Sequence, residues 1–142
     1  MTVYIQTENN YIKNINGTLK KIASWICKDL KLNINSLAII FITDTQIKEL
    51  HKRFLGKSVT TDVITFNLGD SDLIEGEIYI SLDKAKKQAK CYGVSLINEI
   101  SRLITHSCLH LSGYNDNNEK TREIMKKKEN IYVATIQDLF IN

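Results

Sequence analysis

The sequence lacks the features that mark secreted, disulfide-stabilised and membrane-spanning proteins. Its three cysteines, Cys27, Cys91 and Cys108, are an odd number without C-x-x-C spacing, which argues against a disulfide framework or a thiolate zinc site. No apolar stretch approaches the roughly 20 residues of a membrane span. Residues 1–10 are polar and alternating, unlike a basic start followed by an apolar run. We therefore expect a cytoplasmic protein with reduced thiols and no membrane contact.

The net charge and the length limit the kinds of partner and the number of domains. A net charge of +3 permits a polyanionic partner without requiring one. The 142 residues, 43% hydrophobic and 25% charged, suffice for one domain with a hydrophobic core and are too few for two domains of ordinary size. No linker, repeat or low-complexity segment divides the chain. The sequence therefore predicts a single domain over residues 1–142.

Strand-like and helix-like apolar patterns are mixed along the chain. The continuous apolar run Ser36–Ile42 is typical of a strand covered on both faces, and Thr18 is the predicted N-cap of the first helix, after a loop at Asn16-Gly17. The patterns predict strands at 2–6, 36–42, 61–66 and around 78–80, and helices at 18–30, 43–54, 81–92, 95–111 and 118–131. We predict an α+β fold with about four strands in a small mixed sheet and about five helices, one of which borders a cleft.

The segment from His106 to Asp116 holds two of the three histidines. His106 and His110 are four residues apart, so they lie one turn apart on the same helix face, where two imidazoles can share a metal ion. Gly113 supplies a left-handed stop, after which the chain can turn so that Asp116 faces the pair. A lone histidine is more often an ordinary half-buried residue, but the pair with a nearby carboxylate favours a metal site.

The residue after the first histidine limits the classes of metal-dependent hydrolase that the sequence could belong to. A zinc peptidase of the H-E-x-x-H type needs a glutamate there as general base. Ser107 occupies that position and cannot take the proton at neutral pH without help. Metal-assisted hydrolysis of another kind of bond remains open.

Several motifs resemble one family. His106–Asp116 (HSCLHLSGYND) is similar to the H-G-x-L-H-L-x-G-Y-D-H signature of the YbeY family of metal-dependent endoribonucleases, which act in ribosomal RNA maturation. Residues 61–66 (TDVITF) resemble the family's T-D-V-L-S-F, residues 76–80 (GEIYI) resemble G-D-I-V-I, and Gln88-Ala89, Gly93 and Ser95 match as well. The resemblance spans residues 40–132.

The resemblance implies an α+β domain with one zinc ion in a basic groove. It also implies cleavage of single-stranded RNA in late 16S rRNA 3′-end maturation, with the small ribosomal subunit as a partner. The family's third metal ligand is a histidine where this chain has Asp116. A carboxylate binds zinc at about the same distance as imidazole, so we expect His106, His110 and Asp116 to hold the metal. The harder oxygen ligand leaves Mn²⁺ or Fe²⁺ open.

A second departure from the family concerns phosphate binding. Leu55 stands where the family has an arginine, which is expected to hold a phosphate bidentately. Arg53, two residues upstream, is a candidate substitute, and Lys57 could act as a point charge. Three helical lysines could track an RNA backbone or simply be solvated: Lys84, Lys87 and Lys90.

The resulting hypothesis is a zinc site with an open fourth position for water. The candidates for the general base are Asp62, Glu119 and Glu123, and His51, where the family has Asn, is read as exposed or behind the ligands. Two other readings remain. One is an RNA- or ribosome-associated metal-binding factor with weak or lost catalysis, marked by Leu55. The other is a metallohydrolase of another ester or amide bond.

Overall fold

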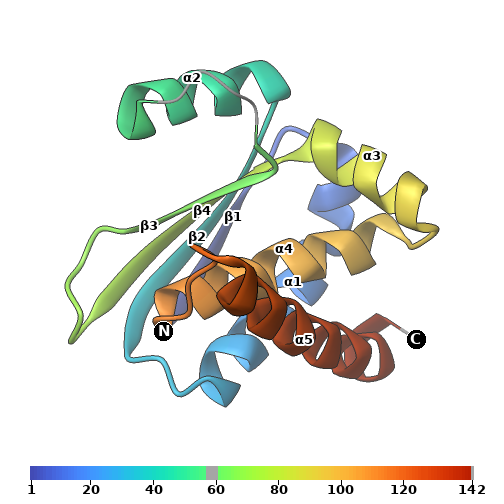
Figure 1. Cartoon of the computed structure of the whole chain (residues 1–142). Coiled ribbons are helices and arrows are strands. Elements are labelled where there is room, and N and C mark those ends of the chain that lie inside the picture. Colours follow the sequence, from blue (N-terminus) through green and yellow to red (C-terminus); the bar gives the residue numbers. More distant parts are fainter. Residues whose placement is uncertain (57–60, 142) are drawn as a thin grey trace.

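Four strands form one mixed sheet in the computed structural model, which describes residues 1–56 and 61–141. They are β1 (Thr2–Gln6), β2 (Ile34–Ile42), β3 (Val63–Asn67) and β4 (Ile74–Ser81), in the spatial order β1-β2-β4-β3 (Figure 1). β1 and β4 both pair with β2 in parallel, and β3 pairs with β4 in antiparallel orientation. Strand β3 is therefore an edge strand of the sheet.

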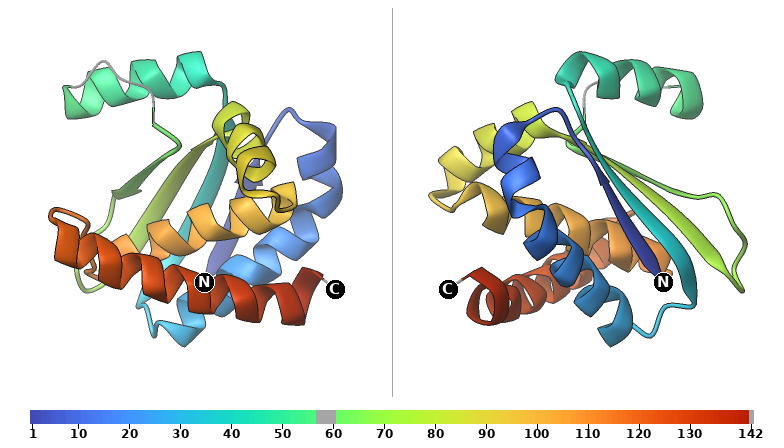
Figure 2. Two further views of the ribbon diagram at one scale, coloured as in Figure 1. Left: turned by 45° about the vertical axis from the view of Figure 1, so that its right-hand side comes forward. Right: turned by 180° about the vertical axis from the view of Figure 1, so that it is seen from behind.

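Five α-helices surround the sheet: α1 (Asn10–Asp29), α2 (Asp44–Leu55), α3 (Leu82–Tyr92), α4 (Leu96–Leu111) and α5 (Glu119–Ile136), the last continued by a π-helical turn (Gln137–Ile141). Helices α1 and α4 cover one face of the sheet, α5 lies across the outer side of α4, and α2 lies on the opposite side of the sheet (Figure 2). The predicted α+β architecture is confirmed. Within the described part of the chain, no helix is both long and apolar enough to span a membrane.

The core lies between the sheet and helices α1 and α4. Its fully buried members include Leu37, Ile39, Ile78 and Ile80 from the sheet, Ile22 and Ile26 from α1, and Ile100 and Ile104 from α4. Burial of each such side chain contributes about 1.5–3 kcal/mol. Helix α4 is thus held between the sheet and α5.

The predicted helix boundaries hold at α2, α3 and α4. The Thr43 side chain accepts from the backbone N–H of Gln46 in a capping box. The side chains of Ser81 and Ser95 cap α3 and α4 by accepting from the backbone N–H groups of Lys84 and Asn98. Gly56 and Gly93 end α2 and α3 in the left-handed conformation.

The predicted start of the first helix is wrong. Helix α1 begins at Asn10, because the Asn9 side chain accepts from the backbone N–H of Ile12 at 3.1 Å and Ile12 is fully buried. This tertiary contact outweighs the preference of Gly17 for a turn, so Gly17 lies inside the helix. Helix α5 extends beyond the predicted residue 131 for a similar reason, since Val133 and Ile136 are buried.

Strands β2 and β3 also differ from their predicted bounds, and β2 differs from its predicted burial. Strand β2 begins at Ile34 and is covered fully on one face only. Leu37, Ile39 and Phe41 are buried, whereas the residues between them are half-buried because α2 lies over only part of that face. Strand β3 begins at Val63, two residues later than predicted.

Candidate metal centre in a groove

Helix α4 presents its two histidines beside its apolar stripe. The stripe faces the core through Ile100, Ile104 and Cys108, all fully buried. His106 and His110 lie on the adjoining edge and are half-buried, as the sequence pattern predicts. Ser107, by contrast, is fully buried and faces away from this edge.

The chain reverses direction directly after α4. The Gly113 N–H donates to the His110 carbonyl, and the Tyr114 N–H donates to the Leu109 carbonyl at 3.0 Å. Gly113 has a φ of 106°, in the left-handed region that favours glycine. This turn brings the Asp116 carboxylate to the two imidazoles.

The three predicted ligand residues converge through one atom each. The Nε2 atoms of His106 and His110 lie 3.1 Å apart, and the Asp116 Oδ2 atom is 3.6 Å from the first and 3.5 Å from the second. Metal bonds of about 2.0–2.2 Å in a tetrahedral arrangement place donor atoms about 3.3–3.6 Å apart. The three donors therefore fit one ion. Within residues 1–56 and 61–141, they are the one such group whose ligand atoms all lie within 4.8 Å of one another.

Glu129 on α5 positions the first histidine. Its Oε2 atom lies 2.7 Å from the His106 Nδ1 atom, and its Oε1 atom lies 3.5 Å from Nη1 of Arg102. With the Nδ1 proton donated to Glu129, the Nε2 lone pair of His106 points toward His110 and Asp116. This is the tautomer that a metal ion requires.

Glu129 also changes the acidity of His106. Burial favours the neutral imidazole, but the hydrogen bond and charge of Glu129, together with the charges of Asp116 and Asp62, outweigh it. The pKa of His106 is raised above its ordinary value as a result. Protons and a metal ion therefore compete for this side chain.

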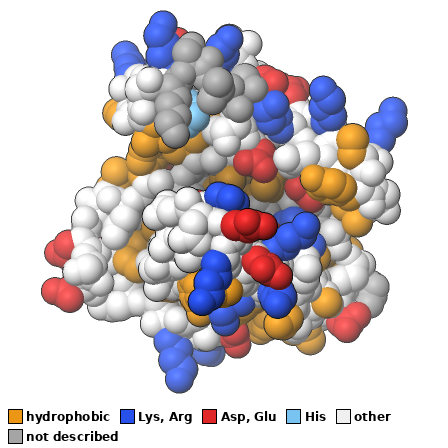
Figure 3. All heavy atoms as spheres, viewed as in Figure 1, with side chains coloured by type: hydrophobic (Ala, Val, Ile, Leu, Met, Phe, Trp, Pro, Cys, Tyr) orange, Lys and Arg blue, Asp and Glu red, His pale blue; other side chains and the backbone are white. Residues whose placement is uncertain are grey.

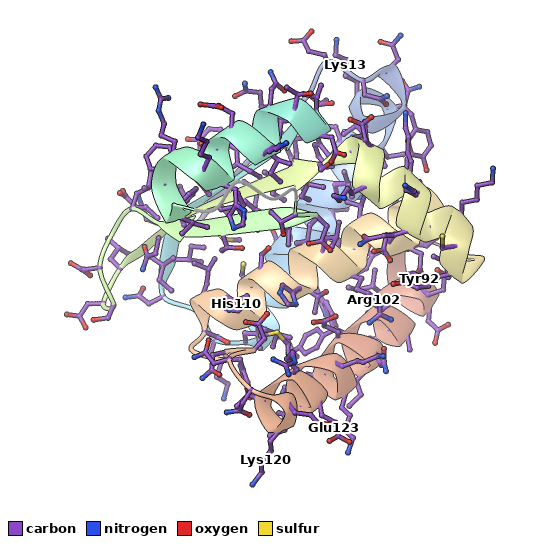
Figure 4. All side chains as sticks on the ribbon, turned by 45° about the horizontal axis from the view of Figure 1, so that its top comes forward. Lys13, Tyr92, Arg102, His110, Lys120 and Glu123 are labelled. Carbon is purple, nitrogen blue, oxygen red and sulfur yellow. The ribbon has the colours of Figure 1, made fainter. Side chains whose placement is uncertain are left out.

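A groove of about 810 Å³ runs along α4 past the three donors. One wall is the C-terminal part of α2 with His51 and Leu55, the floor includes the edge of β3, and the opposite wall is α5 with Arg122 and Lys126. Tyr92 lines the end of the groove that lies farther from His110. Figure 4 shows His110, Arg102 and Tyr92 following the line of α4 along this groove.

Comparison with known proteins identifies the family. The family model described as endoribonuclease YbeY matches residues 3–137. The chain belongs to the endoribonuclease YbeY family. It is 32% identical to endoribonuclease YbeY of Chlorobium phaeobacteroides and 33% identical to that of Bacteroides thetaiotaomicron. The alignments cover 94% of this chain in both cases, and 94% and 98% of those relatives.

A solved structure has a similar fold. The solution structure of TM1509 from Thermotoga maritima is similar to the chain with a TM-score of 0.64 and 26% sequence identity. The match covers 97% of this chain and 90% of that one. The predictions of YbeY membership and of the endoribonuclease class, made from the motifs, are confirmed at the level of the family.

The other predicted residues of this YbeY chain are divided between the groove and the outer surface. Asp62 and Leu55 line the groove, as does His51. The Asp62 Oδ2 atom accepts from Nε2 of Gln88 at 3.2 Å. Lys57 lies outside the described residues. The predicted groups that do not line the groove are Arg53, Lys84, Lys87, Lys90, Glu119 and Glu123.

Two acidic residues of the groove have no prediction from the sequence. Glu129 is one, and Glu99 on α4 is the other: it is only 2% exposed, and its Oε1 atom has no hydrogen-bond partner among the described residues. Burial raises the pKa of Glu99 to about 7, helped by the charges of Asp62 and Glu129 and opposed by Arg102. Both glutamates occupy positions in otherwise apolar helix stripes, which is the sequence signal that marks them.

The charges along the groove are balanced closely. Its lining contains four carboxyl groups, Asp62, Glu99, Asp116 and Glu129, and three cations, Arg102, Arg122 and Lys126. Figure 3 shows Lys and Arg side chains over α2, α3 and α5, with Asp and Glu among them over α5. Counted over the described residues that line it, the groove is therefore not strongly basic, so a bound divalent cation would add much of the positive charge that attracts an anion.

Proposed function

We propose that this chain is a metal-dependent endoribonuclease that cleaves single-stranded RNA, with ribosomal RNA as its substrate. One observation carries the proposal: Nε2 of His106, Nε2 of His110 and Oδ2 of Asp116 converge at the wall of a groove in a member of an endoribonuclease family. Two histidines and a carboxylate are an attested set of protein ligands for a catalytic metal.

We assign zinc to this site, with Mn²⁺ and Fe²⁺ as alternatives because of the Asp116 oxygen. When bound, the ion supplies Lewis acidity toward a phosphodiester and lowers the pKa of a water molecule. The three donor atoms fit a tetrahedral ion, and the groove in front of them gives access to a substrate. Glu129 keeps His106 in the tautomer that can bind it.

Asp62 is our assignment for the proton acceptor. Of the three carboxylates predicted for that role, it is the one that lines the groove, whereas Glu119 and Glu123 are exposed on α5. Its charge also contributes to the raised pKa of His106, which indicates that it acts on the metal site electrostatically. Its hydrogen bond from Gln88 on α3 fixes the side chain beside the edge of β3.

The single-strand preference is supported by Tyr92. This side chain is 67% exposed and lines the end of the groove, so a nucleobase could stack on its ring. Bases of a duplex are already stacked on one another and are less available for such contact. The choice of ribosomal RNA and the association with the small ribosomal subunit rest on the family resemblance. We also propose the cytoplasmic location that the sequence analysis leads us to expect.

Cleavage of a labelled oligoribonucleotide tests the proposal. The purified protein should cut the single strand faster than the same sequence in a duplex. Cleavage should stop with a chelator, return with added zinc, and be lost in His110→Ala. Equal cleavage by wild type and His110→Ala would identify a contaminating nuclease and contradict the proposal.

The same experiment separates the alternatives. Binding of RNA without cleavage, with the metal present, would indicate an RNA- or ribosome-associated factor that has lost catalysis. Metal-dependent hydrolysis of a model ester, without action on RNA, would indicate a hydrolase of another bond. Glu123→Gln is a suitable control variant, because Glu123 is exposed and points away from the groove (Figure 4).

A further inference from the structure

The groove offers few cations for a phosphate next to the metal site. Cleavage of a phosphodiester builds negative charge on the phosphate oxygens, which preorganised cationic donors stabilise. Three cations line the groove in the described part of the chain: Arg102, Arg122 and Lys126. They differ in how far each is already engaged by the protein.

Arg102 is committed to a carboxylate. Its Nη1 atom lies 3.5 Å from Oε1 of Glu129, the same side chain that holds His106, and the guanidinium is largely covered. Its charge is therefore partly neutralised, and moving it toward a substrate would disturb the residue that orients His106. We therefore assign Arg102 the role of partner to Glu129 and not that of a phosphate-binding residue.

Arg122 is placed differently. It lies in the first turns of α5, is exposed, and donates from Nη1 to the backbone carbonyl of Asp116 at 3.3 Å. This hydrogen bond, the one that the guanidinium makes to the described residues, holds it beside the loop that carries Asp116. A guanidinium has five N–H donors in a planar fork, so most of them remain available for a ligand.

Among the residues that the structure describes, the opposite wall provides no matching charge. Leu55 lines the groove from α2 and is 49% exposed, and an apolar side chain there cannot bind a phosphate. Arg53, the cation predicted from the sequence, is not part of the groove lining. Lys126 is on the same wall as Arg122, one helical turn further along α5, and can add only a point charge.

We propose that Arg122 binds a phosphate of the RNA beside the metal site, in a bidentate manner, and thereby supplies from α5 the cation that Leu55 does not supply from α2. The inference rests on the proposed function, since it needs RNA in the groove. It assigns to this chain a phosphate-binding residue on the other wall from the position where the family resemblance places an arginine.

Binding of RNA in the presence of a chelator tests the contact without cleavage. Arg122→Ala should raise the Kd for a short labelled single strand roughly tenfold, the effect of losing a hydrogen-bonded charge contact. It should also reduce the steepness of the salt dependence by about 0.7 in the log–log slope, because one phosphate contact is lost. Lys120→Ala is the matched control: it removes a positive charge from the same end of α5, but Lys120 points away from the groove (Figure 4), and its Kd should stay within about twofold.

A second substitution tests position rather than charge alone. Leu55→Arg in the Arg122→Ala background places the cation on the facing wall, and it should recover at least half of the lost affinity and of the lost cleavage rate on a logarithmic scale. Arg122→Lys should fall between wild type and Arg122→Ala, because lysine keeps the charge without the fork.

The outcomes separate a phosphate contact from a structural role. If Arg122 only held the Asp116 loop, Arg122→Ala would lose metal, and Leu55→Arg would not restore RNA affinity; that result would overturn the proposal. If wild type binds and cleaves RNA but Arg122→Ala and Lys120→Ala have equal Kd values, the Arg122 proposal would be overturned and the proposed function would stand. If wild type neither bound nor cleaved RNA, the proposed function itself would fail.

Discussion

The Nδ1 atom of His106 on α4 lies 2.7 Å from the Oε2 atom of Glu129 on α5. This contact joins two helices across 23 residues of sequence, and it determines which nitrogen of His106 faces His110 and Asp116. Because Glu129 is only 9% exposed, its charge is poorly screened by solvent. Helix α5 is therefore part of the metal centre although it contributes no proposed ligand.

Glu129→Gln should weaken metal binding. The amide keeps the shape of the side chain but removes the negative charge that holds the Nδ1 proton, and loss of such a partner typically lowers metal affinity 10- to 100-fold. Competition with a chromophoric chelator at pH 7.5 measures the change. Glu123→Gln, which alters an exposed glutamate on the same helix, should leave the affinity unchanged. An unaltered affinity in Glu129→Gln would show that His106 needs no such partner.

Metal affinity should also depend on pH. A metal ion binds the neutral imidazole, and the raised pKa of His106 means that protons compete with the ion at higher pH than for an ordinary histidine. The apparent affinity should therefore fall by about tenfold per pH unit once the pH drops below that pKa. In Glu129→Gln the onset of this fall should move to lower pH, which titrations at several pH values would reveal. An onset at the same pH in both proteins would contradict the role given to Glu129.

Asp116→His tests the donor set. Replacing the carboxylate with a third imidazole should shift the preference of the site toward zinc and away from Mn²⁺, because imidazole is the softer ligand. The ratio of zinc to manganese affinity should rise, whereas Asp116→Asn should weaken the binding of both ions. The idea that Asp116 is a ligand would fail if neither substitution changed either affinity.

Glu99 should make the stability of the fold depend on pH. Its pKa is about 7 in the folded protein and near the ordinary 4.5 in the unfolded chain, so the folded state binds the proton more tightly between these values. The free energy of unfolding should therefore fall as the pH rises from about 4.5 to 7, by an amount on the order of 3 kcal/mol, and the contribution of Glu99 should be level outside that window. Urea unfolding of wild type and Glu99→Gln at several pH values isolates the effect. Parallel pH profiles for the two proteins would rule out this assignment.

Local signals in the sequence predicted which three side chains converge as candidate ligands. The four-residue spacing of His106 and His110 and the stop at Gly113 are properties of a single helix end, so they could be deduced without the rest of the fold. The helix caps at Thr43, Ser81 and Ser95 are local in the same sense. The motifs around these residues were enough to identify the family.

The parts that were missed depend on contacts between elements. Glu99 and Glu129 fall at positions of the apolar stripes of α4 and α5, but the stripe alone does not tell whether a charged side chain there is buried. The packing of α4 against the sheet and α5 buries both. Arg122 could not be related to the groove before the position of α5 was known. The start of α1 was misplaced because burial of Ile12 outweighs the local preference at Gly17.

Elemental analysis of protein purified without chelators tests the central claim most directly. The account predicts about one divalent transition-metal ion per chain. The metal should be lost in His106→Ala and also in His110→Ala, while circular dichroism shows that both variants keep the fold. A folded wild-type protein with no stoichiometric metal, or with a metal content that both substitutions leave unchanged, would contradict the proposal that His106, His110 and Asp116 form a metal centre.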